Sequence, residues 1–310
     1  MTTDANAMVE SHLPPQPGTP VRVSTTRPFY WSVRRELWEN RSIYIAPVAI
    51  AALNMFGYMV STIGMPARRR AVLLLDPAQQ RQRIEQSYDM AAMMLLATAF
   101  LVGVFYCLDA LHGERRDRSI LFWKSLPVSD LTTVLSKISI PLLLLPAITF
   151  AITIITQVIM WLWMSLVLLA NGLPLTTYAQ LPIFHSALAL LYGLISLALW
   201  HAPIYGWLLL VSAGARRATF LWAVLPLLAI AALEGIAFQS RHFLDFVKYR
   251  FFGGMSQAFA FNPNEKHPTV DLHELTPGNY LSTPGLWIGL IVAAGFIAAA
   301  VRLRRYRGPL

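Results

Sequence analysis

Apolar residues in this chain form six long, nearly uninterrupted blocks. A helix of about 20 apolar residues crosses the roughly 30 Å hydrocarbon core of a bilayer, and blocks of this length separate a membrane span from a buried helix of a soluble domain. We therefore predict an all-α membrane protein with six transmembrane helices. The predicted spans cover residues 43–63, 90–111, 138–169, 182–212, 218–238 and 285–301.

The third and fourth spans are longer than a bilayer requires, so they must tilt, bend or project beyond it. Pro141 and Pro146 lie in the third span, and Pro203 lies in the fourth. Each proline removes a backbone donor, which gives both helices a physical reason to bend.

Composition agrees with this pattern, since hydrophobic residues make up 56% of the 310 residues and charged residues only 13%, against about a quarter in soluble domains. The net charge of +9 is divided among loop ends, where it meets anionic headgroups. We therefore expect contact with membrane lipid and no nucleic-acid partner. Cys107 is the single cysteine, and His185 and His201 lie about 24 Å apart along one helix. No metal site is predicted.

Basic residues predict the orientation of the spans. With the N-terminus inside, the inner segments carry more Lys and Arg than the outer segments, as cytoplasmic loops do. Arg216, Arg217 and the basic residues at 302–307 weigh most because they adjoin span ends, whereas the arginines at 68–70 argue in the other direction. We predict cytoplasmic N- and C-termini and a multi-pass protein of the inner (plasma) membrane.

Two segments precede the first span. Residues 1–27 are polar and rich in proline and threonine, so we predict a disordered cytoplasmic leader that has too little apolar surface to offset the entropy of ordering. Residues 28–42 read as an amphipathic interfacial helix, with Trp31, Leu37 and Trp38 on one flank. The charged residues expected on the rest of its surface are Arg34, Arg35, Glu36 and Glu39. Residues 28–310 then form one six-span domain.

The loop between spans two and three carries the most specific signal. A mixed-charge cluster at 114–118 is followed by the apolar and aromatic run 120–123 and by Leu126. Pro127 is predicted to end this short helix and Ser129 to cap the next one. An apolar patch ringed by charge usually marks a partner surface. The alternative is a knob folded against the protein's own span ends.

The run E-R-R-D-R-S-I-L-F-W-K-S-L-P-V-S in this loop, followed by a lysine and a long span, resembles the corresponding loop of ABC type-2 exporter permeases. The six-span layout, the amphipathic N-terminal helix and the long outer segment before the last span are similar to the same family. Many members have Gly before the small polar residue, where this chain has Arg118.

The resemblance implies the transmembrane subunit of an ATP-driven exporter, coupled through this loop to a separate ATPase, with residues 28–42 as the connecting helix. Carried over by position, the coupling residues are Glu114, Arg115, Asp117, Arg118, Leu121, Phe122, Trp123 and Leu126. No Gly-x-x-x-x-Gly-Lys-Ser/Thr run occurs in this chain, so we expect no enzyme activity and no cofactor here, with ATP and Mg²⁺ in the partner subunit. A second permease copy or a related permease is expected to complete the complex.

Residues 239–284 are long for a plain connection and small for an independent core. We predict that they enter the outer leaflet as a re-entrant segment or cap the assembly.

Polar residues inside spans are functional candidates by default. Glu234, Asn54 and Gln157 are therefore candidates for a substrate pathway or gate, although Asn54 and Gln157 are also ordinary interhelical hydrogen-bond residues.

A secondary transporter and a non-transporting anchor or sensor subunit are the alternative functions. Secondary transporters tend to show paired discontinuous helices and several midplane charges, which this pattern lacks. An anchor or sensor subunit would have the same six-span topology, so the sequence does not distinguish it from a transporter subunit. An intramembrane enzyme is disfavoured, because no span carries His-Glu-x-x-His and no Gly-x-Ser-x-Gly occurs.

Overall fold

The computed structural model of the protein describes residues 26–64, 77–125, 128–172, 183–260 and 274–308. Helices dominate these residues, and the one bridge of extended backbone seen among them joins Phe259 and Leu275. The elements in chain order are α1 (Thr26–Glu39), α2 (Ser42–Ser61), the 3-10 turn η1 (Thr62–Gly64), α4 (Pro77–Ala110), α5 (His112–Arg116), α6 (Ser119–Ser125), α7 (Asp130–Ser139), the π-helical η2 (Ile140–Leu144), α8 (Leu145–Ala170), α10 (Ile183–Gly214), α11 (Thr219–Phe238), α12 (His242–Ala258), α13 (Pro277–Ser282) and α14 (Pro284–Tyr306).

Six helical stretches of the described chain are long and apolar enough to cross a membrane. They are Ser42–Ser61, Ile84–Arg116, Asp130–Ala170, Phe184–Gly214, Thr219–Phe238 and Pro284–Tyr306. The prediction of an all-α, multi-pass membrane protein with six spans is thereby confirmed. The helix of the second span starts at Pro77 rather than near residue 90, because its first turns are polar and give no apolar signal. Residues 1–25 of the predicted leader lie outside the described part.

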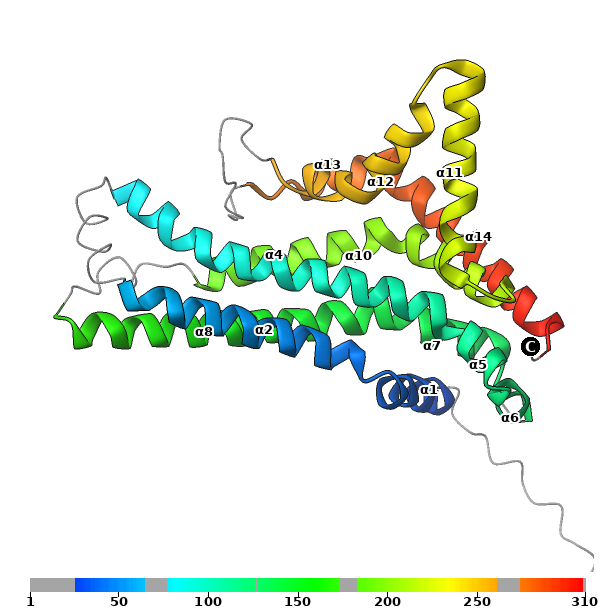
Figure 1. Ribbon diagram of the computed structural model, residues 1–310, viewed down its shortest axis with the longest axis horizontal. Coiled ribbons are helices and arrows are strands. Elements are labelled where there is room, and N and C mark those ends of the chain that lie inside the picture. Colours follow the sequence, from blue (N-terminus) through cyan, green and yellow to red (C-terminus); the bar gives the residue numbers. More distant parts are fainter. Residues whose placement is uncertain (1–25, 65–76, 126–127, 173–182, 261–273, 309–310) are drawn as a thin grey trace, which may run out of the picture.

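The helices α2, α4, α8 and α10 run side by side along the long axis of the molecule (Figure 1). α14 packs against α10. α11 runs across the direction of the other helices, and only 6% of its most apolar stretch is buried. α1, α5, α6 and the C-terminal end of α14 gather at one end of the molecule. The N-terminal helix, the connection between spans two and three and the C-terminal end therefore share one end of the bundle.

The long third span contains a π-helical turn. η2 joins α7 to α8, with Pro141 at its start and Pro146 just after it. In a π turn the backbone bonds run from residue i to i+5, which rotates the side chains that follow onto a different face. Proline supplies no backbone donor, so the helical ladder is weakest here. The irregularity therefore lies where the prolines predict a bend, whereas α10 continues as a helix through Pro203.

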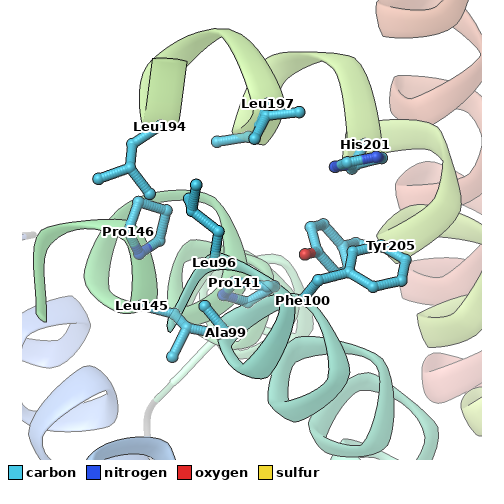
Figure 2. Close-up of a pocket in the computed structure, with 11 residues that line it drawn as sticks. Leu96, Ala99, Phe100, Pro141, Leu145, Pro146, Leu194, Leu197, His201 and Tyr205 are labelled. Atoms are coloured by element: carbon cyan, nitrogen blue, oxygen red, sulfur yellow. The ribbon is translucent and has the colours of Figure 1, made fainter. Parts of the chain in front are cut away.

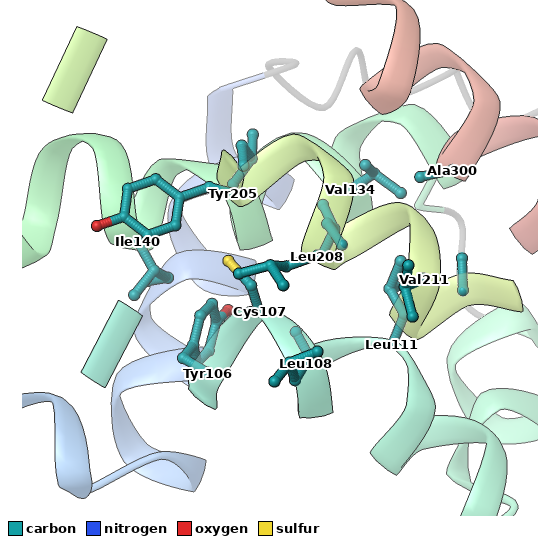
Figure 3. Close-up of a cluster of buried hydrophobic side chains, with 14 of the residues drawn as sticks. Tyr106, Cys107, Leu108, Leu111, Val134, Ile140, Tyr205, Leu208, Val211 and Ala300 are labelled. Carbon is teal, nitrogen blue, oxygen red and sulfur yellow. The ribbon is translucent and has the colours of Figure 1, made fainter. Parts of the chain in front are cut away.

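The largest buried apolar cluster lies where α4, α7, α10 and α14 meet (Figure 3). Leu208 and Ala300 bring α10 and α14 together there, and Val134 adds α7. Cys107 is fully buried in this cluster, where it packs as a small apolar group. This packing fixes the ends of the spans directly beside the charged site described below.

α12, α13 and the start of α14 pack around Trp200 of α10. Trp200 is fully buried, and its indole N–H donates to the carbonyl oxygen of Arg250 at 3.0 Å. The Arg250 guanidinium lies 4.8 Å from the centre of the indole ring and donates to the carbonyl oxygen of Gly285 at 2.9 Å. α12 is thus fastened to both α10 and α14. Entry of this segment into a leaflet stays a prediction.

We expect a Gly289→Ala variant to lose about 1–3 kcal/mol of stability, because a Cβ there would collide with the buried Arg250 guanidinium. Arg250 cannot move aside without losing its contacts with Trp200 and Gly285. Gly295→Ala in the same helix is the matched control, since a Cβ at that position meets no atom within 4 Å. Thermal unfolding in detergent compares the two variants, and equal melting temperatures would contradict this explanation.

Candidate functional site

Buried charged side chains from four elements meet at the end of the molecule where α1 and α5 lie. Glu36 comes from α1, Glu114 from α5, Lys137 from α7 and Arg304 from α14, and all four are buried. Charges are withdrawn from water in this way only when they are paired. We call these four residues, together with Arg35 and Asp130, the ion cluster.

Glu36 and Glu114 are the acidic centres of the ion cluster. The Nζ atom of Lys137 lies 2.8 Å from a carboxylate oxygen of Glu36 and 3.1 Å from one of Glu114. Arg35 bridges the same two acids at 2.7 and 2.8 Å. The hydroxyl of Tyr106 donates to the other carboxylate oxygen of Glu36 at 2.8 Å. The first helix, the end of the second span and the start of the third are thereby joined through two carboxylates.

Arg304 extends the ion cluster to the last span. Its guanidinium lies 3.1 Å from Glu114 and 2.5 Å from Asp130, at the first turn of α7. Three carboxylates therefore face three cations, so the ion cluster carries no net charge. Glu39, which is half exposed, adds a contact to Arg35 at the rim, at 3.5 Å.

The ion cluster keeps its acid on α1 ionised. Burial alone would raise the pKa of Glu36, but the neighbouring Lys137 and Arg35 outweigh burial and hold this pKa below its usual value. Glu36 is therefore a carboxylate at neutral pH, and its attraction to the two cations is fully present there.

α5 is held against the C-terminal end of α10. The guanidinium of Arg115 donates to the carbonyl oxygens of Ala213 and Ala215 at 2.9 and 3.1 Å. The hydroxyl oxygen of Ser212 accepts the backbone N–H of His112 at 2.9 Å. Carbonyl groups in the last turn of a helix lack partners within the helix, so an arginine placed here satisfies them. Arg115 therefore ties α5 to the fourth span.

α6 has an exposed tip above this anchored base. Leu121 and Phe122 are 59% and 60% exposed, whereas Ile120 is buried. The Trp123 ring lies under the Arg35 guanidinium, 3.8 Å from ring centre to guanidinium carbon. Trp123 therefore connects the exposed tip to the ion cluster.

The turns that flank α6 have specific local causes. Arg118, between α5 and α6, has a φ of 58°, in the left-handed region that favours glycine. The hydroxyl oxygen of Ser129 accepts the backbone N–H of Thr132 at 3.0 Å, which confirms the predicted cap of α7. Leu126 and Pro127 lie outside the described residues, so their predicted roles stay predictions.

The predicted coupling residues fall into two groups. Glu114 and Arg115 are buried and make the internal contacts given above. The residues exposed to solvent are Asp117, Arg118, Leu121 and Phe122, and Trp123 is half-buried between the two groups. Asp117 forms only a surface contact, with Arg116 at 3.1 Å. The fold against the span ends thus describes the buried residues, and a partner surface for the exposed ones stays a prediction.

Sequence reasoning missed the residues that complete the ion cluster. The pattern separated Glu36 from Trp31 and Trp38 on α1 but gave no sign that Glu36 is fully buried, while the two tryptophans are 56% and 63% exposed. Lys137 and Arg304 adjoin apolar spans, where a cation needs a partner. The free-energy cost of an unpaired cation there could have indicated that each has an acidic partner. A single sequence does not show, however, that the partner of Lys137 is Glu36, about 100 residues away.

The three candidates for a pathway or gate lie on three different helices. Glu234 on α11 accepts the backbone N–H groups of His242 and Phe243, both at 2.8 Å, so it caps α12. Asn54 donates to the carbonyl oxygen of Ile50 in its own helix at 3.1 Å. Gln157 is buried in α8. Glu234 therefore has a structural role that explains its position without a substrate.

In the part of the chain that the structure describes, no group of three or more His, Cys, Asp or Glu residues is placed to hold a metal ion. Nε2 of His201 donates to the carbonyl oxygen of Phe251 at 3.1 Å. No family model, curated protein or solved structure matches the chain.

Proposed function

We propose that this chain is the transmembrane subunit of an ATP-driven exporter, and that α6 is the element on which a separate ATPase subunit acts. One observation carries the proposal, namely that a single connection between two spans has an exposed apolar tip and a buried ionic base. Leu121 and Phe122 form the tip, and Glu114 lies at the base. An exposed apolar pair on a short helix is the kind of surface that a partner subunit buries.

The contacts at the base support a mechanical role. α5 and α6 are connected by charge-assisted hydrogen bonds to α1 through Arg35, to α7 through Lys137 and to α14 through Arg304. Such bonds are shorter and stronger than neutral ones, and buried networks move as units. A push on α6 would therefore reach α1, the third span and the last span together, whereas a solvated loop would absorb it.

The exposed chemistry of α6 suggests the form of the partner's docking surface. Aromatic anchors dominate the binding energy of interfaces when they enter a pocket and a polar rim excludes water. Phe122 is the exposed aromatic anchor, with Leu121 beside it, and Asp117, Arg118 and Lys124 provide a charged rim. The ATPase is thus expected to present an apolar groove edged by charged groups of both signs.

The remaining parts of the proposal follow from this docking. α6, α1 and the C-terminal end of α14 would face the cytoplasm, where ATP is available, and the membrane would be the inner or plasma membrane. ATP and Mg²⁺ would be bound by the ATPase alone. A second permease copy or a related permease would complete the pathway, since α11 leaves almost its whole apolar surface uncovered in the single chain.

The test is purification of the tagged full chain from its native membrane, with measurement of the ATPase that accompanies it. We expect one ATP-hydrolysing partner to co-purify with the wild-type protein. A Leu121→Glu, Phe122→Glu double variant is expected to weaken that association by at least about thirtyfold, which corresponds to the ~2 kcal/mol of an interface hot spot.

Phe122→Leu, which keeps an apolar anchor, is the matched control and should retain the partner. Trp123 is unsuitable for this purpose because its substitution would also disturb Arg35 and the ion cluster. Undiminished association in the double variant, with its fold intact, would contradict the proposal. Substrate-stimulated ATP hydrolysis by the complex separates an exporter from an anchor or sensor subunit, which would show none.

A further inference from the structure

An apolar groove of about 580 Å³ runs between the third and fourth spans. One wall comes from η2 and α8, with Leu142 and Phe150, and the other comes from α10, with Leu191 and Ile195. Phe29 of α1 lies at one end. This volume falls within the range of about 300–1,000 Å³ that is usual for ligand sites in proteins.

The groove offers no free polar group to a ligand. Ser139 is its one polar residue, and the Ser139 hydroxyl donates to the carbonyl oxygen of Ser136 in its own helix at 2.7 Å. A smaller cavity of about 50 Å³ lies behind the groove and shares Pro146, Leu194 and Ala198 with it (Figure 2). His201 and Tyr205 line that cavity and not the groove. The occupant of the groove is therefore a hydrocarbon.

The shape of the groove indicates a chain rather than a compact molecule. Its lining residues on the third span run from Leu135 to Phe150, a length of about 20 Å at ~1.5 Å per residue. A hydrocarbon leaflet is about 15 Å thick, half of the bilayer core. The groove is thus long enough to follow one chain through one leaflet.

Its position in the bundle gives the groove a direction. Leu135 and Ile138 flank Lys137, which belongs to the ion cluster, and charged clusters of this kind lie near the membrane surface. The Phe29 end of the groove therefore lies at the level of lipid headgroups, and the Phe150 end lies deeper in the hydrocarbon. The groove is open along its side toward the bilayer, since Leu143 and Ile195 at its edges are 66% and 53% exposed. A lipid can enter from the bilayer without crossing the protein.

We propose that this groove holds one acyl chain of a bilayer phospholipid, with the headgroup at the level of α1. The π turn η2 contributes Leu142 and Leu143 to the groove and so helps to shape its wall. The site is independent of the proposed ATPase docking, because it uses no residue of α6.

The experiment uses the full-length protein in phosphatidylcholine vesicles that contain a phosphatidylcholine with a photoactivatable diazirine in one acyl chain. After illumination, mass spectrometry maps the labelled residues. We expect labelling to concentrate on Leu143, Ile195 and the half-buried Phe150. It should exceed the labelling of Leu162 and Leu166 on another part of α8, which are about as exposed as Leu143 and Ile195. Even labelling of all exposed apolar faces would overturn the proposal, because it shows only bulk lipid contact.

Filling the groove provides the second arm. Ala147 lines the groove and is exposed, so Ala147→Trp occupies the space without repacking a core, and labelling of the groove should be lost. Ile195→Trp on the opposite wall repeats the test. Ala52→Trp, an exposed position on α2 outside the groove, should leave the labelling unchanged. Retained groove labelling in both tryptophan variants would overturn the assignment.

Discussion

Replacing Glu114 with Gln is expected to cost about 3–5 kcal/mol of folding stability, the usual cost of removing one partner of a buried ion pair. The carboxylate of Glu114 faces three cations, Arg35 at 2.8 Å and Lys137 and Arg304 at 3.1 Å. Glutamine keeps the shape but leaves the ion cluster with one uncompensated positive charge. Thermal unfolding of the purified variant measures the loss.

Asp117→Asn is the matched control for this prediction. Asp117 lies in the same loop, but its side chain is 64% exposed and pairs only with Arg116, itself 58% exposed. Surface pairs of this kind contribute at most about 1 kcal/mol. A second check is the Glu114→Gln, Lys137→Gln double variant, in which the ion cluster is neutral again and the loss should be smaller than the sum of the two single losses. Equal stabilities of Glu114→Gln and Asp117→Asn would refute the role given to the ion cluster.

Trp200→Ala is expected to cost about 3–5 kcal/mol, as large-to-small substitutions of buried aromatic residues do. Trp200 is fully buried, and Tyr249 and Tyr280 pack on it with ring centres 5.2 and 6.2 Å away. Its loss also removes the donor to the carbonyl oxygen of Arg250 and the ring beneath that guanidinium. The effect should therefore be concentrated in α12.

Limited proteolysis together with thermal unfolding measures this effect. We expect faster cleavage within residues 239–260 of the Trp200→Ala variant than of the wild-type protein. Trp222→Ala on α11 is the control, because Trp222 is 62% exposed and its truncation opens no cavity. If the two tryptophan variants unfold and are cleaved alike, α12 is not fastened by Trp200.

The spans could be predicted because each depends only on residues that are close together in the sequence. An apolar block long enough to cross a bilayer has few alternatives, and the six helices follow the six blocks. The cap at Ser129 was equally accessible, since it depends on one side chain and a backbone N–H three residues later.

The candidate site was predictable only in part because its key contacts are distant in sequence. Glu36 and Lys137 are separated by 101 positions and Glu114 and Arg304 by 190. The amphipathic pattern of residues 28–42 separates Glu36 from the tryptophans, but it does not reveal that Glu36 is buried against distant cations. The outer residues Leu121 and Phe122 were recognisable because aromatic side chains in a charged loop are conspicuous.

The contact between Glu114 and Arg304 also sets an order for the biogenesis of the protein. Ribosomes deliver α14 last, so α5 emerges with its acid lacking one of its three cations until the final span has been inserted. Any chain that stops before residue 304 carries this deficit permanently. The joint that links α1 to α14 can therefore be completed only after residue 304 has been synthesised.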